Sequence, residues 1–371
     1  MSRKRTALPE GDRPITNPGI VKTRYRADFR TIDGQLTGQF YALIQQVGIR
    51  LQLDPGVAPY LVPNVPIVGR YDSGTEFPIN KAALFTNTSK MPGPSFAIPA
   101  GPPAFGGTCP ASALGEVVSK SRATLTTRSG VEIKRLPIVG LSDAESVEPG
   151  KKGLVHGVRA SYAGDETFVC RACYALNGNY NYPSKQINDM MHLAWLEYEL
   201  SQGGPERLGH ALAFAIQHVN ATRPEGFQPY FRIHDAGDFY REDYLEAWVV
   251  CASMMTHMRF WAPTRQWVFA KWTGLLASAQ ERVRAAGGWL TIRPSVLDIG
   301  DIEPKTGPSA GSGVSSEDNN PCIWICPVYN KLIPKPQPDG TTKLEEAASC
   351  LEASCTACWD TPDIPVSYGA H

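Results

Sequence analysis

Apolar residues recur at helical spacing in the middle of the chain. In residues 183–202 (PSKQINDMMHLAWLEYELSQ) and 204–222 (GPERLGHALAFAIQHVNAT), apolar side chains stand three or four positions apart, and Pro or Gly bounds each run. This spacing places the apolar side chains on one face of a helix. We therefore predict two consecutive helices.

Three short runs rich in β-branched and aromatic residues follow, with helical patterns between them. The runs begin near Pro229, Arg259 and Trp289, thirty residues apart each time, and the helical patterns cover about 241–257 and 270–287. Strands that alternate with helices at this spacing form βαβ units with a parallel sheet and right-handed crossovers. We therefore predict an α/β fold with a partial (β/α) barrel-like parallel sheet, although an open sheet fits three strands equally. In either arrangement, ligands bind at the carboxyl ends of the strands.

The flanking regions have other patterns, and we predict three parts of the chain. Residues 1–84 form a basic arm with a small β or irregular region, and residues 85–300 form the α/β core. Six prolines and five glycines in residues 85–117 predict a long loop without regular elements. Residues 118–168 alternate like hairpin strands, which we interpret as an inserted β element. Residues 301–371 form a linker and a Cys-rich metal-binding tail.

Charge is balanced over the whole chain but not along it. The sequence has 36 Lys and Arg against 36 Asp and Glu, which excludes binding to nucleic acid or membrane by bulk charge. The first thirty residues, however, hold eight bases and three acids. This basic arm is either a solvated segment or a contact for a nucleotide or nucleic acid. The chain has no run of about 20 apolar residues and no apolar signal sequence, so we expect a cytoplasmic protein without a membrane partner.

Eight of the nine cysteines fall in two sets, and in a reducing cytosol such sets bind metals or carry out redox chemistry more often than they form disulfides. Cys170 and Cys173 form a C-x-x-C pair, which occurs in redox dithiols, zinc sites and iron–sulfur sites. A redox dithiol needs a helix that starts within the motif, whereas residues 177–181 delay the helix here. Cys109 supplies a third thiolate, and three thiolates leave a metal position open, which favours a catalytic site. The ninth cysteine, Cys251, lies in an apolar helical pattern and is expected in the core.

The C-terminal cysteines are the stronger metal signal. Two chelating pairs with a fifth thiol between them make up this set, namely Cys322, Cys326, Cys350, Cys355 and Cys358. This is the spacing of a tetrathiolate zinc or iron–sulfur site. Such a site would also stabilise a segment that has few apolar residues.

The ends of the three predicted strands are polar. The first strand ends at His234, Asp235 and Asp238, the second at Arg265 and the third at Arg293. The histidine and the two carboxylates suit acid–base chemistry, and the two guanidinium groups suit binding of a carboxylate or phosphate. Alternatively, Asp238 caps the next helix and Arg293 is a structural ion-pair partner. A further alternative is that the first group binds a divalent ion that assists hydrolysis.

Six motifs occur in one order between about residues 86 and 360. They are TNTSKMPGPSFAIPA with CPAS, CRACYALNGNY, FRIHDAGDFYREDYLEAW, RFWAPTR, LTIRPS and CTACWD. With them, the sequence resembles the gene product 88 family of bacteriophage proteins, which implies a phage protein in a host cytoplasm.

The C-x-x-C-Tyr-Ala element followed by βα units is also similar to radical-SAM-like phage proteins of the gene product 37/68 family. That resemblance implies a [4Fe–4S] cluster held by three cysteines, S-adenosylmethionine at the fourth iron, and a partial barrel. In radical SAM enzymes the three cysteines normally follow C-x3-C-x2-C on one loop. Here Cys109 would replace the first of them from a distant loop.

We therefore expect a phage-encoded iron–sulfur enzyme of radical-SAM-like architecture that acts on a nucleotide or nucleic acid. Its catalytic cluster would be held by Cys109, Cys170 and Cys173, and the C-terminal set would hold an auxiliary cluster or zinc. The expected catalytic residues are His234, Asp235 and Asp238, and the expected cofactor-binding residues are Tyr174, Arg265 and Arg293. The alternative is a zinc-stabilised nucleic-acid-binding or scaffold protein without catalysis.

Overall fold

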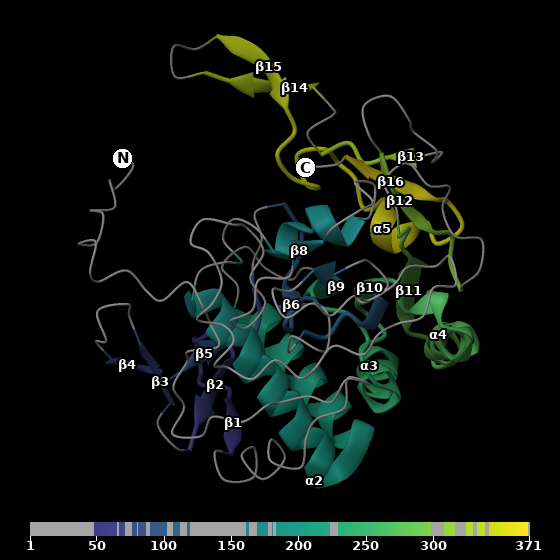
Figure 1. The fold of residues 1–371 in the computed structure, drawn as a ribbon. Helices are drawn as coiled ribbons and strands as arrows, with labels where there is room; N and C mark the ends of the chain where they lie inside the picture. Colours follow the sequence, from purple (N-terminus) through teal and green to yellow (C-terminus); the bar gives the residue numbers. More distant parts are fainter. Residues whose placement is uncertain are drawn as a thin grey trace.

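A four-stranded parallel sheet lies at the centre of the molecule (Figure 1). Its strands are β6 (Ser95–Ala97), β9 (Tyr230–Ala236), β10 (Arg259–Thr264) and β11 (Trp289–Pro294), in the order β11-β10-β9-β6. The predicted α/β class with a parallel sheet is therefore confirmed. Among the described strands the sheet is open, with β11 and β6 at its edges, and no barrel closes.

The structure is a computed structural model that describes the following residues: 48–64, 67–70, 76–79, 81–86, 90–101, 107–111, 117–118, 161–162, 169–176, 180, 183–222, 229–297, 308–315, 324–328, 332–337 and 341–369. The predicted basic arm and Cys322 lie outside them, as does most of the predicted β insertion. The two ends of that insertion pair as antiparallel strands β7 (Val117–Val118) and β8 (Ser161–Tyr162).

Helices cover one face of the central sheet. α3 (Glu242–Met254) and α4 (Ala270–Ala285) pack against the sheet, and α2 (Pro183–Thr222) lies alongside α3. The backbone of α2 is non-helical at Gly203 and Gly204, so it consists of two helices, which confirms that prediction. None of the described helices has an apolar stretch long enough to cross a bilayer.

The core between the sheet and these helices is aromatic and aliphatic. Phe231 of β9, Phe260 of β10 and Ile292 of β11 point into it and are fully buried. They meet Trp248 of α3 and Leu276 of α4 in the same cluster. Burial of apolar side chains at alternate strand positions is thus what attaches the helices to the sheet.

The prediction that residues 85–117 contain no regular element is wrong, because β6 lies within them. Prolines flank this strand, but its neighbours use their carbonyl groups rather than an N–H, from β9 on one side and from the following loop on the other. The carbonyl of Pro94 accepts the N–H of Arg232 at 3.1 Å, and that of Pro99 accepts the N–H of Thr108 at 2.7 Å. A strand of three residues needs few backbone partners, so prolines at its ends do not prevent it.

The pairing between β6 and β9 shifts along the strands. Ser95 and Ala97 are two residues apart, but their partners in β9 are four residues apart. Strict alternation is therefore broken in β9, where Ile233 and the next residue, His234, both pack with aromatic side chains of the helix-side core. Irregularities of this kind redirect side chains, and here the shift leaves Asp235 free to turn toward the carboxyl edge.

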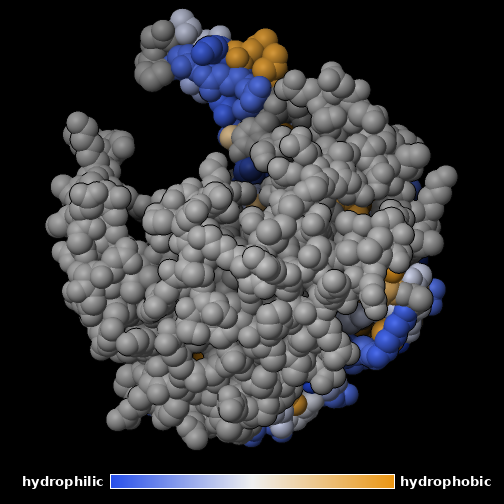
Figure 2. Space-filling view, viewed as in Figure 1, coloured by the Kyte–Doolittle hydropathy of each residue, from blue (hydrophilic) through white to orange (hydrophobic). Residues whose placement is uncertain are grey.

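Smaller β elements surround the core. β1 (Ile49–Gln52), β2 (Tyr60–Pro63) and β5 (Ala82–Ala83) form an antiparallel sheet, and β3 (Ile67–Arg70) pairs with β4 (Glu76–Ile79). Near the C-terminus, β12 (Ser312–Ser315), β16 (Val366–Gly369) and β13 (Trp324–Ile325) form a parallel sheet in that order. The hairpin of β14 (Leu332–Pro336) and β15 (Thr342–Glu346) projects from the body, and its hydrophilic and hydrophobic residues are both visible in Figure 2.

The C-terminal segment covers the face of the sheet opposite the helices. Its short helix α5 (Ala357–Asp360) carries Trp359, whose ring lies 5.4 Å from that of Tyr230 and 5.3 Å from that of Trp261. The indole N–H of Trp359 donates to the carbonyl of Phe231 at 3.0 Å. Aromatic packing and a backbone hydrogen bond therefore attach α5 to β9 and β10.

A buried arginine fastens this segment to β11. Arg293 is 0% exposed, and its five donor positions all end on backbone carbonyl groups. The acceptors are the carbonyls of Ala310, Ala357, Cys358, Thr361 and Ile364. A buried charge is costly unless its hydrogen-bonding capacity is filled, and here the C-terminal segment fills it.

We expect Arg293→Met to lower the free energy of unfolding by about 3 kcal/mol or more, because several buried carbonyl groups lose their donor. Arg293→Lys should restore only part of this stability, since an ammonium group has three donors without the planar fork. Urea unfolding followed by circular dichroism measures both changes.

The matched control is Arg282→Met in α4, which breaks a surface pair with Glu246. It should cost less than about 1 kcal/mol. If Arg293→Met were as mild as this control, the fastening role of Arg293 would be refuted.

Candidate functional site

The loop after β6 brings Cys109 to the carboxyl edge of the sheet. The hydroxyl of Thr108 donates to the carbonyl of Pro99 at 2.7 Å, and the N–H of Cys109 donates to the carbonyl of Gly101 at 2.9 Å. Gly237, at the end of β9, has a φ of +88°, and a Cβ there would lie 2.6 Å from the Thr108 hydroxyl. The loop and the strand end therefore approach each other at a distance that only glycine allows.

The C-x-x-C pair reaches the same edge from another segment. The N–H of Val169 donates to the carbonyl of Leu297, just beyond β11, at 2.8 Å. This bond anchors a 3₁₀ turn (Val169–Ala172) that contains Cys170, and Cys173 follows it directly. Cys109 and Cys173 pack against one cluster of four buried alanines from β6, β9 and the adjoining turns. The structure thus brings the three predicted cysteines together.

Arg265 supplies positive charge beside these thiols. Its Nε donates to the carbonyl of Val296 at 2.9 Å, which holds the guanidinium at the end of β10. Burial opposes this charge, but the negative charge available at the three thiols and at Asp238 outweighs burial and raises the pKa of Arg265. Burial, and then Asp238, raise the pKa of Cys109 well above its ordinary range. Arg265 therefore interacts electrostatically with Asp238 and the thiols, and its binding of an anionic ligand stays a prediction.

Asp238 joins the ends of β9 and β10. Its carboxylate accepts hydrogen bonds from the hydroxyl of Thr264 at 2.6 Å, from the N–H of Arg265 at 2.9 Å and from the N–H of Phe239 at 2.7 Å. Burial raises the pKa of Asp238 to about 6, although these donors act in the opposite direction. The alternative interpretation as a helix cap is not supported, because α3 begins later, at Glu242.

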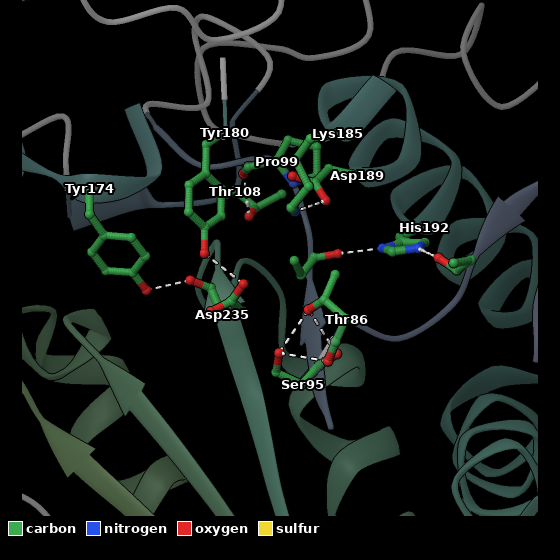
Figure 3. A network of polar contacts seen from close by, with 12 residues as sticks. Thr86, Ser95, Pro99, Thr108, Tyr174, Tyr180, Lys185, Asp189, His192 and Asp235 are labelled. Carbon is green, nitrogen blue, oxygen red and sulfur yellow. Dashed lines mark hydrogen bonds and ion pairs between the residues drawn. The ribbon is translucent and has the colours of Figure 1, made fainter. Parts of the chain in front are cut away.

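Asp235 gathers a second polar group at this edge (Figure 3). The hydroxyl of Tyr180 donates to its carboxylate at 2.6 Å, and Arg232 lies 3.3 Å from the other carboxylate oxygen. The hydroxyl of Tyr174 donates to the backbone carbonyl of Asp235 and accepts a hydrogen bond from Arg232 at 2.6 Å. Tyr174 directly follows Cys173 and is 45% exposed. The group therefore presents an aromatic ring to solvent beside the thiols.

The start of α2 adds a group of titratable side chains to this region, namely Lys185, Asp189 and His192. Lys185 pairs with Asp189 at 2.5 Å, and its ammonium lies 5.0 Å from the ring centroid of Tyr180. The two ring nitrogens of His192 lie 2.6 and 2.7 Å from backbone carbonyls of β6 and β5 (Figure 3). Burial lowers the pKa of His192 and raises that of Asp189. Their spacing in the sequence could have revealed this group, because Lys185, Asp189 and His192 stand at positions i, i+4 and i+7, which share one helix face.

Two of the predicted site residues make their contacts elsewhere. His234 packs against the rings of Phe239 and Tyr244 in the helix-side core, with Nε2 3.3 Å from the Tyr244 hydroxyl. Arg293 has its donors on the C-terminal segment, as described above. This matches the structural alternative for Arg293, with backbone carbonyls in place of an anionic partner.

The C-terminal cysteines form a separate group. Cys350 belongs to a small hydrophobic cluster, and Cys326 and Cys355 pack against it. Cys358 is the second residue of α5. No disulfide links any of the eight cysteines that the structure describes. Over the same part of the chain, no three His, Cys, Asp or Glu side chains stand as a ready set of ligands for one metal ion. Metal binding by either cysteine group is therefore a proposal.

Comparison with known proteins gives one match. A family model described as Gene product 88 matches residues 73–282, which include Cys109, Cys170, Cys173, Asp238 and Arg265. The C-terminal cysteines and Arg293 lie beyond the matched region. No curated protein and no solved structure matches the chain.

The buried imidazole of His234 makes stability depend on pH. Burial lowers the pKa of His234 from 6.5 to about 3. As the pH falls from 6.5 toward about 3, the unfolded chain takes up a proton that the folded chain does not, so stability is lost over this range and is fully present above it. Replacement by Gln in His234→Gln should flatten this loss by on the order of 1 kcal/mol per pH unit.

Urea unfolding of His234→Gln and the unchanged protein at several pH values between about 7 and about 4 measures this difference. His210→Gln, which removes an exposed histidine of α2, is the matched control. Equal pH slopes for His234→Gln and the unchanged protein would show that the imidazole is not held neutral.

Proposed function

The chain belongs to the gene product 88 family, and we propose that it is an iron–sulfur enzyme of radical-SAM-like type that acts on a nucleotide or nucleic acid. The observation that supports this most is the convergence of three thiols with Arg265 at the carboxyl edge of a parallel sheet. That edge is where α/β folds bind ligands. In this proposal, the open four-stranded sheet corresponds to part of a (β/α) barrel.

The donor set at this edge fits an iron–sulfur cluster. Thiolates are the ligands of iron–sulfur clusters and of zinc, and Cys109, Cys170 and Cys173 are the thiols available here. Such a cluster, held by three cysteines, supplies one iron to which an external ligand such as S-adenosylmethionine binds. A closed structural zinc site needs four protein ligands, whereas a cluster site needs only the three thiols, and among the described residues the charged groups beside them are Arg265 and Asp238. The positive charge of Arg265 would stabilise the thiolates.

Other side chains at this edge have distinct roles in the proposal. Asp238 orients Arg265 through the backbone and, with a pKa of about 6, can hold or release a proton near neutral pH. Asp235 positions Tyr180 and Arg232, and Arg232 in turn positions the exposed ring of Tyr174. An exposed tyrosine ring suits stacking against a nucleobase. His234 would act through packing and Arg293 by holding the C-terminal segment.

The proposed substrate is a nucleotide or nucleic acid. This proposal draws on the basic residues of the first thirty positions, which lie outside the described residues, and on the ring of Tyr174. A zinc-stabilised protein that binds nucleic acid without catalysis would use the same basic arm, and metal content distinguishes the two.

We expect the full-length protein, purified without oxygen, to be brown, with broad visible absorbance, bound iron and acid-labile sulfide. The double substitution Cys170→Ala with Cys173→Ala should remove most of the iron at this edge, because two of three ligands are lost. Cys251→Ala is the matched control, since Cys251 is buried in α3 away from both cysteine groups and should leave the iron content unchanged.

Colourless protein with zinc and no iron, even after anaerobic reconstitution with iron and sulfide, would refute the enzyme proposal and favour the zinc-stabilised alternative. Equal iron in the double variant and in Cys251→Ala would refute the assignment of the ligands.

A further inference from the structure

Three C-terminal thiols that are close in sequence, Cys350, Cys355 and Cys358, meet a fourth, Cys326, which is more than twenty residues away. The N–H of Cys355 donates to the carbonyl of Cys350 at 2.9 Å, which closes a tight turn between them. The N–H of Cys326 donates to the carbonyl of Ser367 in β16 at 2.8 Å. A hydrophobic cluster of Val328, Ala347 and Ala353 encloses Cys350, with Cys326 and Cys355 packed against it.

The fourth thiol joins through its neighbour on β16. The Sγ of Cys358 lies 3.2 Å from the hydroxyl of Tyr368, the residue that follows the partner of Cys326. Hydrogen bonds to sulfur are a common feature around thiolate-bound metals. Backbone contacts of β16, the turn between Cys350 and Cys355, and the short helix α5 therefore place the four cysteines.

These thiols also interact electrostatically. Burial raises the pKa of Cys350 to about 12, and the charges of the other three thiols add to this shift. Burial likewise raises the pKa of Cys358 to about 11, and Cys326 and Cys355 contribute. These mutual effects reflect how close the four sulfur groups lie to one another, and that proximity is what suits a shared metal.

We propose that Cys326, Cys350, Cys355 and Cys358 together hold one thiolate-bound metal centre, and that Cys322 is not a ligand. The sequence pairs alone would make Cys322 a ligand and Cys350 a spare. Cys322 lies outside the described residues, and its exclusion follows from the four other thiols, which fill the four positions of such a site. The inference does not depend on the proposed reaction. The shared chemistry is a thiol-binding metal, either a zinc ion or an iron–sulfur cluster.

The position of this centre indicates a structural role. Cys358 and its neighbours Ala357 and Thr361 supply carbonyl groups to Arg293, so α5 takes part in both the thiol group and the arginine contacts. α5 has four residues and β13 has two, which are too short to be stable alone. A metal centre would fix these elements on the second face of the sheet, as structural metals do in small segments.

The test uses the full chain with Cys109, Cys170 and Cys173 all changed to Ala, so that any bound metal belongs to the C-terminal segment. Serine substitutions are then made singly at Cys326, Cys350, Cys355, Cys358 and Cys322. Metal and acid-labile sulfide are measured on the purified proteins. We expect each of the first four substitutions to remove most of the metal and Cys322→Ser to retain it. Zinc without sulfide identifies a zinc ion, and iron with sulfide identifies a cluster.

A second variant separates loss of a ligand from loss of folding. Cys350→His can still bind a metal, because three cysteines and one histidine form an ordinary zinc site, so it should retain cobalt added as cobalt(II) chloride where Cys350→Ser does not. Cobalt–thiolate absorbance reports the ligands directly.

Two outcomes would overturn the inference. One is metal loss in Cys322→Ser as complete as in Cys350→Ser, and the other is a metal-free triple variant even after reconstitution. If the triple variant holds metal but the unchanged protein holds no additional iron, the proposed enzyme fails and this centre stands. If the unchanged protein holds iron and the triple variant holds no metal of any kind, this centre fails and the proposed enzyme stands.

Discussion

The shift in pairing between β6 and β9 is the constraint on which the candidate site depends. A regular β9 would send consecutive side chains to opposite faces, and the polar residues at its end would be divided between the core and the C-terminal segment. Two more residues lie between the paired positions of β9 than between those of β6. As a result His234 enters the core and Asp235 turns to the carboxyl edge. Gly237 then lets the loop that carries Cys109 approach the strand end. The thiols and Asp235 thus share one edge through a backbone irregularity.

Buried polar contacts act together with aromatic packing on the second face of the sheet. Arg293 and Trp359 contribute buried hydrogen-bonding groups that end on backbone atoms across the interface. Such groups stabilise only the correct arrangement, since each misplaced partner leaves a buried polar atom unsatisfied. The short helix α5 and the two-residue strand β13 can therefore occupy a defined position, which hydrophobic burial alone would not specify.

The sequence predicted the regular part of the fold and missed what depends on tertiary contact. The thirty-residue repeat located β9, β10 and β11 because buried strands and amphipathic helices impose their own spacing. β6 was missed because three residues between prolines carry no periodicity. The cysteines that meet at the edge were recognisable by chemistry, whereas Arg232 and Tyr180 were not, because a lone arginine or tyrosine has no spacing signal. The sequence could not show whether Arg293 binds a ligand or holds the C-terminal segment, since both roles use the same guanidinium group.

Arg232 connects the two cysteine groups. It donates a hydrogen bond to Tyr174, beside Cys173, and lies over the ring of Trp261 at 4.9 Å on the face that the C-terminal segment covers. Burial opposes its charge, but Tyr174 and Asp235 raise the pKa of Arg232, and its charge in turn favours the thiolate of Cys350. Arg232 therefore makes contacts on both sides, with Tyr174 and Asp235 at the carboxyl edge and with Trp261 on the second face. Because the C-terminal segment covers that second face, it borders the surroundings of the site as well as packing on the sheet.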